Sequence, residues 1–242
     1  MSSTLTYSTT VSSGITLYRI TSLAFKSGVP STHSRVVNGL GALRSRTGAR
    51  YNYPGVRTVY LTEDLITCLA EKMFYFHREV LRGLDLSHHL GVIPPFQQTF
   101  VLWEVVLKSK VSNVADLHSL PQFTYFNIFP SLPLNPSQDY EHLKDRRAHI
   151  QSLSYDGLRV GSSRNISHGK LVVLFDDQSS NVASITPHDI DFRLIADPGT
   201  PPHDFVNQTT QILDFTAGEV SSPTLALPGV AHSGWYRVQF NH

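Results

Sequence analysis

The sequence lacks several features that mark membrane-spanning, secreted and disulfide-bonded proteins. It has no run of eighteen apolar residues, so we expect no transmembrane helix. Residues 1–14 are rich in Ser and Thr and lack the basic and apolar regions of a secretory signal, and we expect them to form a flexible N-terminus. Cys68 is the only cysteine, which excludes an intrachain disulfide and favours a reducing cytoplasm.

The sequence also has no excess of charge of one sign. The formal net charge is +1, and charged residues make up 16% of the chain. Proteins that bind nucleic acid or an anionic membrane surface usually carry a clustered basic excess. We therefore expect neither direct nucleic-acid binding nor membrane binding. Hydrophobic residues make up 40%, which is typical of a globular protein.

Several motifs for catalysis and metal binding are missing as well. There is no HExxH, no GxxxxGK[ST] phosphate loop and no GxSxG elbow. The segment GLGALR, residues 39–44, has an arginine where a dinucleotide-binding loop needs its third glycine, so we reject a Rossmann fold. Twelve histidines are present, but none of them form a set with ligand spacing; His142 and His149, for example, are two helical turns apart. We expect no bound metal and no cofactor.

The periodicity of apolar residues predicts an α+β protein. One helix is expected to begin after a capping Thr62 and to stop near Gly83. A second is expected from Pro136, with Asn135 as N-cap, to about Leu153. Strands are expected at short stretches rich in β-branched and aromatic residues: 15–21, 57–61, 100–107, 170–175, 190–196 and 235–240.

One stretch, GARYNYPGVRTVYLTEDLITCLAEKMFYF, carries the strongest candidates for chemistry. Arg50 is followed after ten residues by Tyr60, and Tyr60 after eleven by Glu71. Glu71 lies three residues after Cys68 and four before Tyr75, so its neighbours on a helix are weakly polar or aromatic and it has a reason to face inward. Structural ion pairs produce the same pattern, so a site and a structural role both stay open on these residues alone.

The text GARYNYPGVRTVYL followed by CLAE resembles the RES domain family, which is named for its Arg, Glu and Ser. Two further segments agree with the family and occur in the same order. LYRI matches its opening strand, in which Arg19 recurs. GLRVGSSRNISHGKLVVLF resembles its serine segment and places Ser162 at the family serine and Arg164 at the following arginine, although Ser163 can also fill the serine position.

This resemblance implies a single α+β domain similar to the ADP-ribosyltransferase toxins, with central mixed or antiparallel sheets and flanking helices. The RES-like core is expected at 15–176, with a C-terminal extension, 177–242, packed on the same domain. Family members degrade NAD by cleaving its nicotinamide–ribose bond, as phosphorylases or hydrolases. NAD is then the substrate, with inorganic phosphate as an optional co-substrate. Members of the family commonly act as toxins that are held by an Xre-type antitoxin protein. Formation of a homo-oligomer is left open.

The resemblance also implies roles for particular residues. The expected catalytic residues are Arg50, Tyr60 and Glu71, and the expected substrate-binding residues are Tyr18, Arg19, Tyr51, Ser162 and Arg164. Arginine forks grip phosphate oxygens, and a carboxylate stabilises the oxocarbenium-like ribose that forms as nicotinamide leaves. Two alternatives stay open: a catalytically idle module that binds a nucleotide or protein, and transfer of ADP-ribose to another acceptor.

Overall fold

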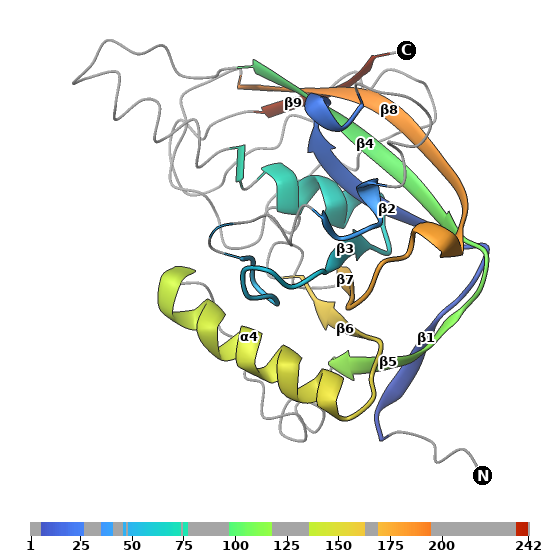
Figure 1. Ribbon diagram of the computed structural model, residues 1–242. Coiled ribbons are helices and arrows are strands. Elements are labelled where there is room, and N and C mark those ends of the chain that lie inside the picture. Colours follow the sequence, from blue (N-terminus) through green and yellow to red (C-terminus); the bar gives the residue numbers. More distant parts are fainter. Residues whose placement is uncertain are drawn as a thin grey trace.

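The computed structural model describes residues 6–26, 35–40, 46, 48–73, 75–76, 97–117, 136–162, 169–194 and 236–241. In this part of the chain, nine strands form one sheet in the order β1-β5-β6-β7-β3-β2-β4-β8-β9 (Figure 1). β5 and β6 run parallel, and the other neighbours run antiparallel. The strands are β1 Ser8–Val11, β2 Thr16–Ser22, β3 Val59–Thr62, β4 Gln97–Leu107, β5 Val111–Leu117, β6 Gly157–Gly161, β7 Lys170–Leu174, β8 Val182–Leu194 and β9 Tyr236–Asn241.

Helices flank this sheet. The helix α4 spans Pro136–Ser152, and a second helical segment spans 65–73 and continues at 75–76. Two short 3-10 turns, η1 at Leu23–Phe25 and η3 at Ser179–Asn181, follow β2 and precede β8. The α+β class predicted from the sequence is confirmed. No helix in the described residues is long and apolar enough to cross a bilayer.

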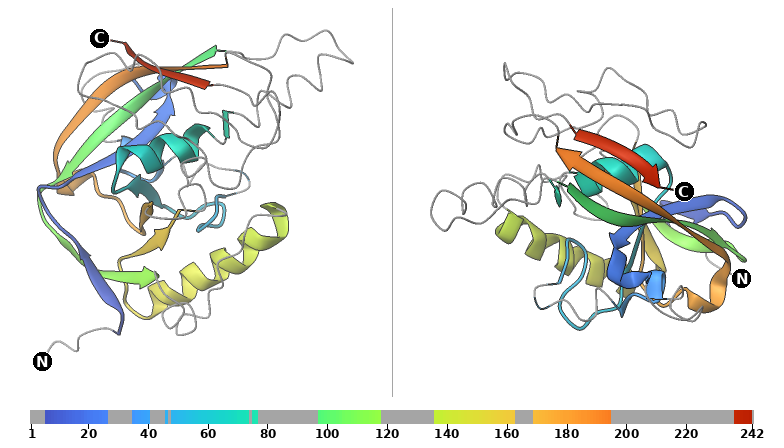
Figure 2. Two further views of the ribbon diagram at one scale, coloured as in Figure 1. Left: turned by 180° about the vertical axis from the view of Figure 1, so that it is seen from behind. Right: turned by 90° about the horizontal axis from the view of Figure 1, so that it is seen from above.

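The sheet has two halves that are bent relative to each other. Two short connections carry the chain from one half to the other. Residues 12–15 join β1 to β2, and residues 108–110 join β4 to β5. The two strands that each connection joins lie in different parts of the sheet. The two bends run side by side, and Gly14 N–H donates to the carbonyl of Leu107 across them (3.2 Å). As Figures 1 and 2 show, the long strands β2, β4 and β8 form one half, and β5 and β6 turn away from it.

Both faces of the central strand β7 are buried. Val172 and Leu174 point into one apolar cluster with residues of β2 and β4, whereas Leu171 and Val173 point into another with residues of β5, β6 and α4. This alternation follows from the period of two in a strand. Burial of a whole Val or Leu side chain contributes about 1.5–3 kcal/mol to the stability of the fold. The two clusters therefore fix the position of β7 and, with it, that of its neighbour β3.

The helix α4 covers the β5–β6 end of the sheet (Figure 1). Its inward face carries Leu143, Arg147 and Ile150, all nearly fully buried, as the spacing of these residues predicts. The guanidinium of Arg147 lies 4.4 Å from the ring centroid of Phe175, and it donates to the carbonyl of Arg57 (3.4 Å). α4 is thus tied to one end of the β3–β7 pair, where β3 begins and β7 ends.

The sequence analysis missed β1, β5 and β6. Residues 8–11, expected in a flexible N-terminus, form an edge strand paired with β5. The segment VSNVADL of β5 has little apolar alternation, and its polar residues Ser112 and Asn113 are exposed in the structure. β8 also begins at Val182, earlier than the expected 190. The expected continuation of the first helix to Gly83 lies outside the described residues.

Candidate functional site

A cavity of about 310 Å³ lies where β2 and β3 separate. In the described residues, β2 and β3 are paired at a single position, Tyr18 opposite Thr62. The residues that would continue the pairing line the cavity instead: Arg19, Ile20, Tyr60 and Leu61. The site therefore lies between two strand edges near the middle of the sheet, where both strands are held from their far sides by β4 and β7.

A tight turn brings Arg50 to this cavity. Ala49 and Asn52 exchange backbone hydrogen bonds of 3.1 and 3.3 Å, so Arg50 and Tyr51 occupy the two central positions. Gly48 precedes the turn with a φ of +71°, and a Cβ there would lie 2.2 Å from the carbonyl oxygen of Asn52. Only glycine fits such a position without strain. Both central residues of the turn line the cavity.

The hydroxyl of Tyr60 fastens this turn to β3. It accepts a hydrogen bond from the backbone N–H of Tyr51 (3.0 Å) and donates one to Oδ1 of the fully buried Asn52 (2.7 Å). Burial raises the pKa of Tyr60 far above its ordinary value, so the hydroxyl keeps its proton. The sequence analysis expected Tyr60 to be a catalytic residue, and the structure shows in addition that its hydroxyl holds the turn that carries Arg50.

Arg19 enters the cavity from β2. Its guanidinium donates a hydrogen bond to the carbonyl oxygen of Val36. Burial lowers the pKa of Arg19 to about 10, so the side chain is still charged at neutral pH. No carboxylate of the described residues forms an ion pair with Arg19. A partly desolvated cation without a paired carboxylate favours binding of an anionic group.

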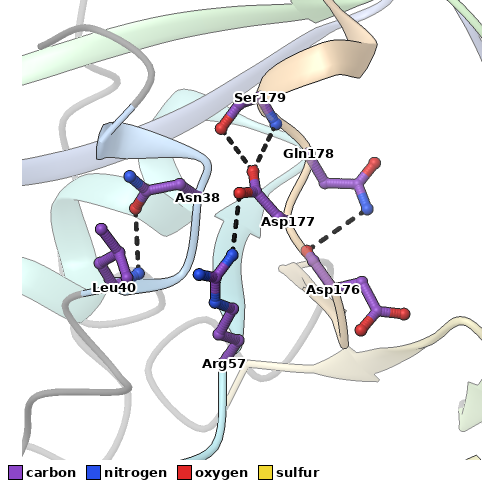
Figure 3. Close-up of polar contacts among 7 residues, drawn as sticks. All are labelled: Asn38, Leu40, Arg57, Asp176, Asp177, Gln178 and Ser179. Carbon is purple, nitrogen blue, oxygen red and sulfur yellow. Dashed lines mark hydrogen bonds and ion pairs between the residues drawn. The ribbon is translucent and has the colours of Figure 1, made fainter.

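The loop that carries Val36 is held by the turn before β8. The backbone N–H of Gln178 donates to the carbonyl of Val37 (2.9 Å). Beside this contact, Arg57 forms an ion pair with Asp177 (3.0 Å), whose other oxygen accepts from the backbone N–H of Ser179 (2.8 Å), as Figure 3 shows. These contacts join the loop, the residues just before β3 and the turn, and so fix the carbonyl that orients Arg19.

The helical segment of residues 65–73 and 75–76 supplies Glu71, the one carboxylate among the described residues that line the cavity. Oδ1 of Asp64 accepts from the backbone N–H of Thr67 (2.7 Å), so Asp64 is the N-cap. The sequence analysis assigned this role to Thr62; in the structure, the Thr62 hydroxyl donates instead to the carbonyl of Asp64 (2.9 Å). The negative cap also suits the positive N-terminal end of the helix dipole.

An aromatic cluster anchors the far end of the same helix. The buried ring of Phe76 makes edge-to-face contacts with Phe100 of β4 and Phe192 of β8, at centroid distances of 6.2 and 5.9 Å. Such pairs contribute about 0.5–1.5 kcal/mol beyond the burial of their area. The helix is therefore fixed at both ends, and Glu71 lies between them.

Glu71 and Ser162 meet at this site although 91 residues separate them in sequence. The buried hydroxyl of Ser162 donates to Oε1 of Glu71 at 2.7 Å. Ser162 directly follows β6, and its backbone N–H donates to the carbonyl of Gly169 (2.8 Å). Ser162, which the sequence analysis placed at the family serine, is therefore in contact with the expected Glu71. Ser163 and Arg164 lie outside the described residues.

One face of the helix lines the cavity with residues at helical spacing: Cys68, Glu71, Lys72 and Tyr75. Burial raises the pKa of the Cys68 thiol to about 12, against a weaker opposing effect of a hydrogen bond with Thr62, so the thiol is neutral. Lys72 and Tyr75 were not predicted as site residues. The spacing of one and four residues from Glu71 is the signal that would have found them.

Six of the eight residues expected at the site line the cavity together: Tyr18, Arg19, Arg50, Tyr51, Tyr60 and Glu71. Burial raises the pKa of Tyr18, and the nearby carboxylates of Glu104 and Asp64 raise it further. Ser162 reaches the site through Glu71, as described above. Within the described residues, no three His, Cys, Asp or Glu side chains are grouped so as to hold a metal ion.

Comparison with known proteins identifies the family to which the chain belongs. The sequence profile described as RES domain matches residues 16–197. The chain belongs to the RES domain family. The RES domain thus includes β8, which the sequence analysis placed in a C-terminal extension beginning at residue 177.

A comparison with curated proteins found no significant match. Six chains of solved structures are significantly similar. One belongs to the crystal structure of the M. tuberculosis MbcT–MbcA toxin–antitoxin complex, with 15% identity, coverage of 74% of this chain and 86% of that chain, and a TM-score of 0.47. The assignment to the RES domain family rests on the sequence profile.

Proposed function

We propose that this RES domain cleaves the N-glycosidic bond between nicotinamide and ribose in NAD. The observation that supports this most is the hydrogen bond of 2.7 Å between Ser162 and Glu71, at a cavity that Arg19 and Arg50 also line. Two arginines, one glutamate and one serine, the residue types for which the family is named, thus converge from β2, the turn before β3, the helix and the end of β6.

Two arginines suit the pyrophosphate of NAD. A guanidinium presents a planar fork of donors that binds phosphate oxygens in pairs. Arg19 reaches the cavity from β2, and Arg50 reaches it from the turn that Tyr60 holds. In the proposed complex both donate to phosphate oxygens. This fixes the dinucleotide with its nicotinamide ribose beside Glu71.

Glu71 suits the chemical step. When the bond between C1′ and nicotinamide breaks, its electron pair neutralises the pyridinium nitrogen, and the positive charge moves to the ribose. A carboxylate beside that ribose stabilises the charge as it develops, an effect of about 3–4 kcal/mol per contact in a water-poor site. An acceptor oxygen then bonds to C1′. If the acceptor is water, it loses one proton.

Ser162 acts in this scheme through Glu71. The geometry supports a donor that holds the carboxylate in one orientation, because the hydroxyl already points at Oε1. A nucleophilic serine needs a base within hydrogen-bond reach, and the carboxylate of a single glutamate without a histidine is a poor one. Ser162 is therefore proposed as a positioning residue, with no covalent intermediate on it.

The test is a product analysis. The full-length protein is incubated with NAD, with and without inorganic phosphate, and the products are identified by mass spectrometry. Free nicotinamide together with ADP-ribose indicates hydrolysis, and nicotinamide together with a phosphorylated ADP-ribose indicates phosphorolysis. ADP-ribose attached to a protein indicates transfer. Absence of nicotinamide release under all conditions, with NAD bound, contradicts the proposal and favours an idle nucleotide-binding module.

We further propose that the protein is the toxin of a toxin–antitoxin pair, with an Xre-type antitoxin as its partner. Membership of the RES domain family supports this role, and loss of NAD supplies a mechanism of toxicity. Wild type and Glu71→Gln are expressed at matched levels in cells while growth and NAD are followed. We expect wild type to deplete NAD and stop growth, and the variant to do neither. Equal toxicity of the two proteins would contradict the link between cleavage and growth arrest.

A further inference from the structure

The exposure of the lining residues indicates that the cavity is closed near Cys68 and open near Tyr75, both on the helical segment of residues 65–73 and 75–76. Cys68 is 5% exposed, whereas Tyr75, two turns later on the same face, is 42% exposed. Glu71 lies between them. A ligand whose reacting bond lies at Glu71 therefore extends past the next turn of the helix as it leaves the cavity.

The volume of the cavity indicates that much of a bound dinucleotide must lie toward its open end, near Tyr75. Sites for small molecules span about 300–1,000 Å³, and this cavity of about 310 Å³ is at the small end of the range. It suits roughly one nucleoside. With the nicotinamide riboside beside Glu71, the second nucleoside of NAD must lie toward the open end, where Lys72 and Tyr75 line the cavity.

Lys72 and Tyr75 have the chemistry that such a second nucleoside requires. The ammonium of Lys72 lies 4.2 Å from the ring centroid of Phe100, a buried residue of β4, so the charge is held at a defined place. A compact ammonium suits a phosphate as a point charge. Tyr75 offers an aromatic face at the opening, and bases stack on such faces whatever their identity.

We infer that Lys72 and Tyr75 form a subsite for the non-reacting half of the substrate, an adenosine with its adjacent phosphate. The ring of Tyr75 stacks on the base, and Lys72 contacts the phosphate. This inference rests on the proposed function. It makes the protein selective for a dinucleotide over nicotinamide mononucleotide, which carries the same scissile bond and lacks the second nucleoside.

The experiment compares kcat/KM for NAD and for nicotinamide mononucleotide in Lys72→Met and Tyr75→Ala. Matched controls are Lys26→Met and Tyr53→Ala, which change an exposed lysine and an exposed tyrosine outside the cavity lining. We expect each cavity variant to lose at least about tenfold more kcat/KM with NAD than with the mononucleotide. The controls should leave the ratio of the two substrates unchanged.

Two further measurements keep the test decisive. Tyr75→Phe keeps the aromatic face and should retain the wild-type ratio, and thermal melts check that each variant folds. An equal loss with both substrates, or no loss, overturns the subsite. If wild type cleaves neither substrate, the proposed reaction fails, and the subsite is then tested by calorimetry with AMP. Weaker AMP binding to Tyr75→Ala than to Tyr53→Ala supports the subsite, and equal binding or no binding overturns it.

Discussion

The hydroxyl of Tyr60 lies 2.7 Å from Oδ1 of Asn52, and through this bond and the N–H of Tyr51 it fastens the turn that carries Arg50. This contact gives a physical reason for the spacing of ten residues between Arg50 and Tyr60. The strand places the ring in the cavity wall, and the turn folds back onto its hydroxyl. In the proposed complex with NAD, Tyr60 would therefore affect substrate binding through Arg50.

The first prediction follows from this contact. Tyr60→Phe keeps the ring but leaves the buried Asn52 oxygen and the Tyr51 N–H without this partner. We expect the free energy of unfolding to fall by about 1–3 kcal/mol. Because a loosened Arg50 binds NAD less well, we expect KM for NAD to rise by about tenfold, with a smaller change in kcat.

A double-mutant cycle separates this role from direct contact with the substrate. If Tyr60 acts through Arg50, Tyr60→Phe should cost much less in kcat/KM when Arg50→Lys is already present, because the fork that the turn positions is gone. Additive losses in the double variant would mean that Tyr60 contributes independently of Arg50.

The second prediction concerns Gly48. Gly48→Ala must adopt a φ near +71° and place a Cβ 2.2 Å from the carbonyl of Asn52, so the turn has to open. Gly55 is the matched control, because its φ is +79° but nothing lies within 4 Å of the added Cβ. Both variants carry the backbone cost of about 1–2 kcal/mol, and Gly48→Ala carries the clash in addition.

We therefore expect Gly55→Ala to keep near-normal NAD turnover and Gly48→Ala to lose most of it at a temperature at which both are folded. Urea unfolding and steady-state assays measure the two effects. Similar activities in the two variants would show that the geometry of the Arg50 turn does not matter for turnover.

The third prediction concerns Ser162. Ser162→Ala removes the donor that orients the Glu71 carboxylate. We expect kcat to fall by about tenfold, in line with one hydrogen bond, and KM to change little. Combined with Glu71→Gln, the loss should be less than the product of the two single losses, because both variants affect the same carboxylate. A multiplicative loss, or a change confined to KM, would assign Ser162 to direct substrate binding.

The strand, turn and helix around the site were largely predictable because each has a local signal. Tyr60 and its neighbours alternate in a β-branched stretch, and Leu69 and Phe76 repeat at helical spacing and are buried. By contrast, β1 and β5 have weak local patterns. Their pairing depends on the bends at 12–15 and 108–110, which bring distant residues together.

Contacts within the site were harder to predict than its residues. Tyr60 was expected to be catalytic and Ser162 to bind substrate, and the sequence did not reveal that their hydroxyls contact Asn52 and Glu71. Each contact depends on tertiary geometry: one on a turn that needs Gly48, the other on the pairing of β3, β7 and β6. A single sequence reveals which groups are present and not which partner each one finds.

The fourth prediction is that Glu71 serves the chemical step more than binding. Bound NAD carries its positive charge on the nicotinamide ring, and the charge moves toward Glu71 only as the bond breaks. An interaction that grows along the reaction path lowers the barrier without tightening the ground state. Glu71→Gln should therefore reduce kcat by about a hundredfold or more, while NAD affinity changes by less than about tenfold.

Single-turnover cleavage and equilibrium binding measure these two quantities separately, and a thermal melt checks folding. Ser162 can donate to the amide oxygen of a glutamine as well, so the local hydrogen bond is preserved in the variant. A folded Glu71→Gln protein that cleaves NAD at close to the wild-type rate would remove the carboxylate from the mechanism.

The last prediction concerns pH and the Cys68 thiol. Burial raises its pKa to about 12 in the folded protein, from an ordinary value of 9.0. The unfolded chain thus releases this proton first as pH rises. The stabilisation is fully present below pH 9 and is lost progressively between pH 9 and 12, at up to about 1.4 kcal/mol per pH unit for one proton. Tyr60 and Tyr18 act in the same direction, because their pKa values are also raised.

Cys68→Ala isolates the thiol from the two tyrosines, since it removes one titrating group from the folded and unfolded states alike. We expect wild type to lose on the order of 1 kcal/mol more stability than Cys68→Ala between pH 8 and pH 10, measured by urea unfolding at each pH. Between pH 6 and 8 the two stability curves should run parallel, because the thiol is protonated in both states. Curves that stay parallel up to pH 10 would mean that the thiol ionises as readily in the folded protein as in the unfolded chain, and that the inner end of the cavity is open to water.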